Sequence, residues 1–305
     1  MKRHTILRMA LLSGLMVTTA AVANTSDLRY TISVHEFSNE AGYRGQWNIG
    51  RGFETIMTDL LNDSGKFIVL GDSEMREAAL DEQDFGESGR TAQGRRTPET
   101  GRMTPAQLLV RGSITDVQET AGGSGGINIG GFRIGGSRER AEVNMTVYLV
   151  DTTTGQVMAS QSVTGDSGSR GIGLGYYGDR LGGLTGDLEG FTSDNLGKAC
   201  AAAVDEAIEF MVAELDSIQW EGSVVRVSGE DRVIINRGTR EGVSEGMQFS
   251  VGEIEEIIDP DTGELLDMEM LEKGVLEATE VRERITICRI VSGEDIEEGM
   301  SVFAQ

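Results

Sequence analysis

Two strand-like runs joined by a tight turn constrain this chain more than any other feature. Val143–Val150 and Gln156–Val163 both alternate apolar and polar residues and are rich in β-branched side chains. The five residues between them, Asp151–Gly155, carry the polar side chains and the terminal glycine of a hairpin turn. The pattern therefore predicts an antiparallel hairpin at the centre of the fold.

Two glycine-rich arms, at about 121–137 and 165–191, flank this hairpin. In the second arm, apolar residues alternate with glycine or polar residues at Ile172, Leu174, Tyr176, Leu184 and Leu188. Runs of about ten residues with this period of two are the signature of a transmembrane β-hairpin, which has lipid on one side and a wet lumen on the other. Glycine-rich surface loops are the alternative, because ordering glycine costs much backbone entropy.

The first arm follows the alternation less well. Ile127 and Ile129 fall on one face of an extended strand, whereas Phe132 and Ile134 fall on the other, so the phase changes at Gly130–Gly131. Two arms cannot close a barrel alone, and unpaired strand edges are not tolerated in lipid. Membrane insertion would therefore require several protomers in a ring.

The first 23 residues have the pattern of a cleavable secretory signal peptide. Lys2, Arg3 and Arg8 precede or flank the apolar run Met9–Val17, and Ala21–Ala23 supplies small residues for cleavage. No cysteine lies at this junction, so we expect an exported protein of the outer membrane or periplasm that is not a lipoprotein.

The chain is strongly acidic, with a formal net charge of −23. Cleavage would leave 24 basic residues against 50 acidic ones, or −26. We expect no nucleic-acid partner for such a chain, because its acidic surface would repel the phosphates.

Hydrophobic periodicity predicts a domain of the α+β class over 24–218, a mixed sheet with packed helices and two β-hairpin arms. A helix capped by Asn48 carries an apolar face from Ile49 to Leu61, and a long helix spans Lys198–Leu215. Residues 219–305 contain short strand patterns separated by glycine and aspartate turns, which predict a small SH3-like antiparallel β-barrel. The predicted strands are Gly222–Val227, Arg232–Asn236, Met247–Glu253, Gly274–Val281, Ile285–Ile290 and Ser301–Phe303.

The sequence contains no recognisable catalytic set. After cleavage one histidine, His35, remains, and no triad, metal cluster or phosphate-binding loop can be assembled, so we expect neither enzymatic activity nor a cofactor or metal. Asp259–Glu264 resembles part of a calcium loop, but position twelve is Met270, and a hairpin turn explains the segment better. Cys200 and Cys288 either form a disulfide in an oxidising compartment or remain two buried small side chains.

An ordered set of short segments resembles the curli secretion channel CsgG family over about residues 29–215. The segments are Ile32–Phe37, Gly65–Leu70, Leu109–Ile114, Val143–Val150 with Thr153–Gln156, and Gly190–Asp194 before an alanine-rich helix. The barrel region is similar to the carboxy-terminal domain of the flagellar assembly protein T family, through Val233–Gly238, Gly242–Met247 and Asp259–Leu265.

The resemblance implies a homo-oligomeric ring in the outer membrane, in which each subunit lends two hairpins to one barrel. In that family the loop after the first strand narrows the pore. The matching loop here is Ser38–Asn48, so Tyr43, Trp47 and Asn48 are constriction candidates, and an ordinary surface loop with Trp47 packed beneath it is the alternative. The family's lipidated cysteine is missing, and the first arm is short.

These observations together predict an oligomeric outer-membrane secretion channel that passes unfolded polypeptide by diffusion. Its expected partners are copies of itself, the polypeptide cargo, periplasmic accessory proteins and outer-membrane lipid. The alternative is a soluble periplasmic assembly or scaffold protein of an envelope machine such as the flagellar basal body.

Overall fold

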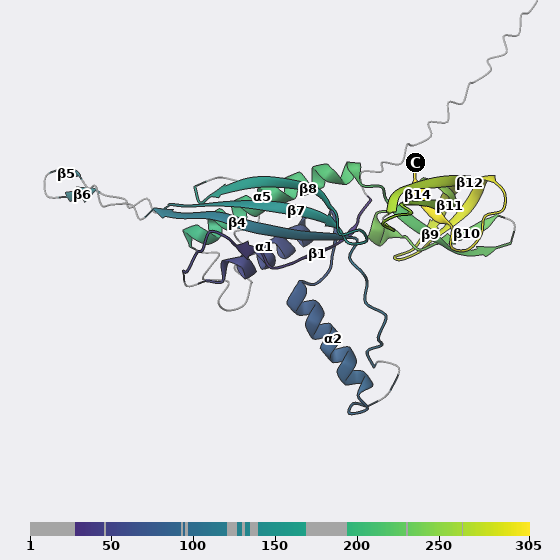
Figure 1. Cartoon of the computed structure of the whole chain (residues 1–305), viewed down its shortest axis with the longest axis horizontal. Coiled ribbons are helices and arrows are strands. Elements are labelled where there is room, and N and C mark those ends of the chain that lie inside the picture. Colours follow the sequence, from purple (N-terminus) through teal and green to yellow (C-terminus); the bar gives the residue numbers. More distant parts are fainter. Residues whose placement is uncertain are drawn as a thin grey trace, which may run out of the picture.

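The computed structural model describes residues 28–45, 47–92, 94, 97–120, 127–129, 132–134, 140–168, 194–229, 231–263 and 265–305. A mixed sheet with helices on one face occupies one half of the molecule, and a β-barrel lies at one end of it (Figure 1). This arrangement confirms the predicted α+β class.

The sheet has the strand order β3-β1-β4-β7-β8, and the short β2 pairs with β4. β1 runs parallel to β3 and β4, whereas β4, β7 and β8 are antiparallel neighbours. The strands are β1 (Thr31–Val34), β2 (Ser38–Asn39), β3 (Ile68–Val69), β4 (Leu108–Thr120), β7 (Arg140–Asp151) and β8 (Val157–Asp166).

The predicted central hairpin is β7 and β8. Asp151 forms the turn, since its Oδ1 accepts hydrogen bonds from the backbone N–H groups of Thr153 at 2.9 Å and Thr154 at 2.7 Å. Gly155 adopts a φ of +73°, a left-handed conformation that favours glycine. The turn chemistry in the sequence therefore fixes the pairing of these two strands.

Helices α1 (Ile49–Ser64) and α5 (Asn195–Glu214) pack against the sheet. The alternating residues of β7 from Ala141 to Leu149 are buried on the face that meets α5. The apolar face predicted for α1 is confirmed, because all of its large members are buried: Ile49, Phe53, Ile56, Met57, Leu60 and Leu61. Each such side chain stabilises the fold by roughly 1.5–3 kcal/mol relative to exposure.

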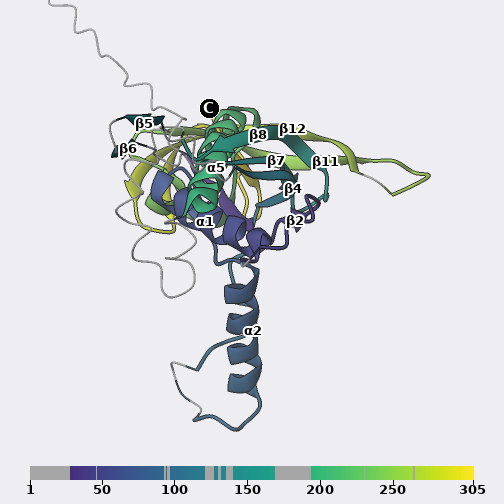
Figure 2. The same cartoon turned by 90° about the vertical axis from the view of Figure 1, so that its left-hand side faces the viewer.

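The third helix, α2 (Ser73–Glu87), projects away from the sheet (Figure 2). Glu54 of α1 holds its first residue, because the buried Oε1 accepts hydrogen bonds from the Ser73 hydroxyl at 2.6 Å and N–H at 3.2 Å. Asp72 caps the helix through a bond from Met75 N at 2.9 Å. Within the helix only Gly86 is buried.

Six strands close into a barrel with the order β10-β13-β12-β11-β14-β9. A short 3-10 turn, η3 (Leu215–Ser217), links α5 to it, and η4 (Thr239–Glu241) lies between β10 and β11. The strands are β9 (Glu221–Ser228), β10 (Arg232–Ile235), β11 (Gln248–Ile258), β12 (Leu265–Val281), β13 (Thr286–Gly293) and β14 (Ser301–Ala304).

Strands β11 and β12 are longer than the sequence pattern predicts. Instead of ending at Glu253, β11 continues to Ile258, and β12 begins at Leu265 rather than Gly274. The carboxylate of Asp259 makes the turn between them, accepting hydrogen bonds from the N–H groups of Asp261 at 2.7 Å and Thr262 at 3.3 Å. Asp259 therefore holds a hairpin turn, as predicted, and these N–H groups lower its pKa.

The two cysteines are free thiols, so the disulfide alternative is wrong for this structure. Cys200 lies in α5 against the sheet, and Cys288 lies in β13 inside the barrel. Burial raises the pKa of Cys200 well above its usual value and that of Cys288 to about 12. Both act as the small buried side chains of the other alternative.

The barrel joins the sheet through direct contacts. The N–H of Arg29 donates to the carbonyl of Glu241 at 3.0 Å, and the Tyr30 hydroxyl donates to the carbonyl of Ile218. One continuous cluster of buried apolar residues runs from the sheet into the barrel through Trp220. The two parts therefore share a core at their junction.

Candidate functional site

The loop from Ser38 to Asn48 follows β1, and its first residues are fixed by β4. Ser38 and Asn39 pair in parallel with Ser113 and Ile114, and the N–H of Ala41 donates to the carbonyl of Ile114 at 2.8 Å. This close approach needs Gly112, because a Cβ there would lie 2.0 Å from the Phe37 ring. The start of the loop is therefore an extension of the sheet.

A side-chain amide folds the loop back on itself. Asn39 donates from Nδ2 to the carbonyl of Tyr43 at 2.8 Å, and its Oδ1 accepts from the N–H of Tyr43 at 3.0 Å. The Tyr43 ring is half-buried against the core. Burial raises the pKa of the Tyr43 phenol, and the negative charges of Glu119 and Asp194 raise it further.

Trp47 connects the loop to the start of α5 through a hydrogen bond. Its indole Nε1 donates to Asp194 Oδ2 at 3.3 Å, while Asp194 Oδ1 caps α5 by accepting from Gly197 N at 2.9 Å. The half-buried Trp47 ring packs against the core. One carboxylate thus positions both the loop and the start of α5.

Asn48 is the N-cap of α1, as predicted. Its Oδ1 accepts from the N–H of Arg51 at 3.2 Å, and its Nδ2 donates to Glu36 Oε1 at 3.1 Å. Both polar ends of the side chain have partners within the subunit.

The sequence analysis did not include two exposed charged residues of the loop, Glu40 and Arg44, among its candidates. Their charges within a polar loop were the feature from which they could have been predicted.

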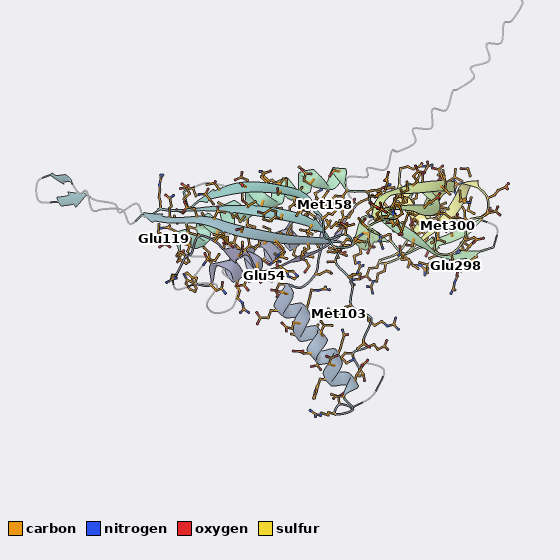
Figure 3. The ribbon with its side chains drawn as sticks, viewed as in Figure 1. Glu54, Met103, Glu119, Met158, Glu298 and Met300 are labelled. Atoms are coloured by element: carbon orange, nitrogen blue, oxygen red, sulfur yellow. The ribbon has the colours of Figure 1, made fainter. Side chains whose placement is uncertain are left out.

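Both arms leave the sheet at the same end as this loop. The first arm emerges between Thr120 of β4 and Arg140 of β7, which are paired. The second follows β8, whose last residue, Asp166, pairs with Glu142. Glu119 marks this end of β4, and the barrel lies at the opposite end of the sheet (Figure 3).

The first arm contains a strand pair among its described residues. β5 (Ile127–Ile129) and β6 (Phe132–Ile134) form an antiparallel pair in which Ile127 lies opposite Ile134 and Ile129 opposite Phe132. β5 ends at Ile129 and β6 begins at Phe132, so the two sets of apolar positions belong to different strands. The four apolar positions are therefore paired with one another in the register.

The sequence candidates of the second arm lie outside the described residues: Ile172, Leu174, Tyr176, Leu184 and Leu188. The base of that arm is described, and the N–H of Ser167 donates to the carbonyl of Ala141 at 2.9 Å. The Ser167 hydroxyl accepts from the N–H of Ala141 at 3.0 Å. The β7–β8 pairing thus continues up to the arm.

A cavity of about 480 Å³ lies at the junction of sheet and barrel, lined by residues that include Tyr30, Leu215, Ile218 and Trp220. The Trp220 indole N–H has no acceptor among the described residues. This cavity is at the opposite end from the arms and is not part of the loop site. In the described part of the chain, no three acidic, histidine or cysteine residues are grouped to hold a metal.

The model of the family described as "Curli production assembly/transport component CsgG" matches residues 15–241. The chain belongs to the CsgG family. Membership confirms the resemblance seen in the ordered sequence segments, and it makes this chain a CsgG-like protein of the outer membrane or periplasm. The similarity of the barrel to flagellar assembly protein T remains a prediction.

Several solved structures have distantly similar folds. The hypothetical protein CT253 from Chlamydia trachomatis is 14% identical, with 62% of this chain and 99% of that one covered and a TM-score of 0.36. The PelC dodecamer from Paraburkholderia phytofirmans is 13% identical, with 59% of this chain and 86% of that one covered and a TM-score of 0.29. The LpoB C-terminal domain from Escherichia coli is 15% identical, with 49% of this chain and 88% of that one covered and a TM-score of 0.26.

At TM-scores this low, a likeness of fold indicates nothing about function, whereas the family match extends over most of the chain. No curated protein matches the chain in sequence. Among the described residues, no helix is both long enough and apolar enough to span a membrane.

Proposed function

We propose that the protein is an oligomeric outer-membrane channel that exports unfolded polypeptide by diffusion. The observation that carries this proposal is the position of three segments: both arms and loop 38–48 leave one end of one sheet. In a ring of subunits this end would face the membrane, so that each copy offers two hairpins and one loop to a common pore.

The arms would form the wall of the pore. A β-structure can cross lipid only when every strand edge is paired, so hairpins from neighbouring subunits must complete one another. The β5–β6 pairing of apolar with apolar residues and of Asn128 with Arg133 supports one lipid-facing and one lumen-facing side. The five apolar residues of the second arm would continue the lipid-facing side.

The loop would form the constriction. Among the three candidates, Trp47 and Asn48 use their polar groups within the subunit, and we assign them to holding the loop. Tyr43 and the exposed Arg44 follow the Asn39 turn and would contact the passing chain. No nucleotide or metal is needed for passage through such a pore, which is not enzymatic.

Residues 219–305 would form a periplasmic domain at the end of the sheet that lies away from the membrane. Its position at the end opposite Glu119 leaves the barrel available for accessory proteins (Figure 3). Residues 1–23 would be removed during export.

Membrane fractionation followed by electron microscopy of the detergent extract tests this proposal. We expect the mature protein in the outer membrane and rings with a central pore in the extract. A matched variant that lacks 122–136 and 169–190 should remain in the soluble periplasmic fraction. Recovery of the wild-type protein only as a soluble monomer would contradict the proposal.

The second candidate function is a soluble periplasmic scaffold of an envelope machine such as the flagellar basal body. The barrel favours it, because the segments that resemble flagellar assembly protein T lie within it. Val233–Gly238 begins in β10, Gly242–Met247 precedes β11, and Asp259–Leu265 connects β11 to β12. This function predicts arms that proteases cleave in the intact cell envelope and purification without detergent. Protection of both arms in outer-membrane vesicles would exclude it.

A further inference from the structure

The hairpin of β11 and β12 extends well beyond the barrel (Figure 2). Within the barrel, β11 pairs with β14 from Phe249 to Gly252, and β12 pairs with β13 from Gly274 onward. From Glu253 to Lys273 the described residues of the two strands pair only with each other. We call this segment, residues 253–273, the ribbon.

The two faces of the ribbon differ in chemistry. Directly opposite residues share a face, which places Ile254 with Met270 and Glu256 with Met268. On β11 alternation continues this face to Ile258, which lies opposite Leu265 after a register shift beyond Ile257. The outer part of this face is open to solvent, since Met268 is 51% exposed and Ile258 is 50% exposed. One face is therefore mainly apolar, and its carboxylates are those of Glu256 and of Glu272, which lies opposite Gly252.

The other face is mainly acidic, with Ile257 and Leu271 as its apolar residues. Glu255 lies opposite Glu269, and Ile257 lies opposite Asp267. Like charges directly opposite each other on a strand pair destabilise it. The nearest basic group is Lys273, whose Nζ lies 3.5 Å from Glu253 Oε1. The ribbon has nine acidic residues and this one lysine.

A two-stranded ribbon of this kind is at best marginally stable in water without a third element against it. Both of its outer edges have backbone donors and acceptors without a strand neighbour among the described residues. Such an edge is a template for the addition of another strand. Exposed methionines adapt readily to a partner's shape.

Charge decides between the possible occupants. A second ribbon from another copy would place nine further carboxylates beside these nine, and an anionic membrane surface would also be repelled. A basic chain is attracted by the same charges. We propose that the ribbon docks a partner protein through an extended segment in which apolar side chains alternate with lysine or arginine.

This inference does not depend on channel function, because docking can be measured in solution. The probe is a labelled ten-residue peptide of alternating valine and lysine, and a valine–glutamate peptide is its matched control. We expect the lysine peptide to bind the full mature chain and to slow amide hydrogen exchange in residues 253–273. Raising NaCl from about 0.05 to about 0.5 M should weaken binding at least about tenfold.

Two variants separate the contributions of the faces. Met268→Ser with Ile258→Ser should lower affinity at least about tenfold by removing the apolar contact, and Glu255→Gln with Glu269→Gln should reduce the salt dependence. Val225→Ser is the control, since Val225 is also 50% exposed but lies on β9. Equal binding of the glutamate peptide, or an equal loss in the control variant, would overturn the proposal. So would self-association in sedimentation velocity that Met268→Ser abolishes, because the occupant would then be a second copy.

Discussion

Gly165 lies where β8 passes beneath α5, at the end of the sheet that carries the arms. A Cβ at this position would lie 1.9 Å from the carbonyl oxygen of Ala199 and 2.6 Å from the N of Ala203. Gly165 on β8, with Ala199 and Ala203 on α5, allows the backbones of the strand and the helix to pack in direct contact. This contact places the start of α5, and with it Asp194 and Trp47.

We predict that Gly165→Ala destabilises the fold by about 3 kcal/mol, since the clash is with backbone that cannot rotate away. Gly94→Ala is the control, because a Cβ at Gly94 meets nothing within 4 Å. Urea unfolding followed by circular dichroism measures both. Equal stability of the two variants would show that α5 does not lie on β8 as described.

The buried thiols predict a dependence of stability on alkaline pH. An unfolded cysteine has a pKa of about 8.5, whereas burial raises the pKa of Cys288 to about 12 and also raises that of Cys200. Below pH about 8.5 both states keep their thiol protons, so this stabilisation is fully present. Above it the unfolded chain loses protons that the folded chain keeps, and stability falls until the folded pKa is reached.

Each thiol should lower the free energy of unfolding by about 1.4 kcal/mol per pH unit in that range. The double variant Cys200→Ala with Cys288→Ala should show a shallower decline from pH about 8.5 to about 10.5. Urea midpoints at several pH values give the two slopes, and parallel slopes would contradict the burial of the thiols.

Individual residues differed in how well the sequence predicted them. The cap of Asn48, the turn of Asp151 and the left-handed Gly155 follow from local backbone chemistry, and the structure confirms them. The bond between Trp47 and Asp194 joins residues 147 positions apart. No local pattern contains such a contact, so the role of Trp47 in holding the loop required the structure.

At the scale of elements, the stability of helix α1 tests whether Asn48 acts as its N-cap or only as a loop residue. If the side chain is mainly a cap, Asn48→Ala should cost about 1 kcal/mol of stability, and Asn48→Asp should restore most of it. Asn62→Ala, in the last turns of the same helix, is the control. Thermal unfolding checks the order of the variants, and an unchanged melting temperature in Asn48→Ala would argue against the cap.

The barrel shows why some elements were predicted only in part. Strand patterns in the barrel come from one buried face, and the structure extends β11 and β12 into a region where neither face is buried. In that region the sequence Glu253–Glu256 has no strand pattern, because residues that are exposed on both faces need not alternate between apolar and polar. The cross-strand register supplies the information that a single strand lacks, as it also does for β5 and β6.

At the scale of the whole molecule, each subunit of the proposed ring would contribute the charged residues of its loop 38–48 to the constriction. Arg44 is exposed and follows the turn held by Asn39, so Arg44→Glu would reverse one charge per subunit at the constriction. We predict an increase in cation over anion selectivity, measured as the reversal potential in a salt gradient. Arg226→Glu, on β9 of the barrel, is the control and should leave the selectivity unchanged.

Conductance of the purified mature protein in planar lipid bilayers tests the channel proposal most directly. We predict discrete conductance steps of uniform size, which are lost when 122–136 and 169–190 are deleted although the sheet still folds. Bilayers that stay silent with full-length protein, while all of that protein remains soluble without detergent, would contradict the channel proposal.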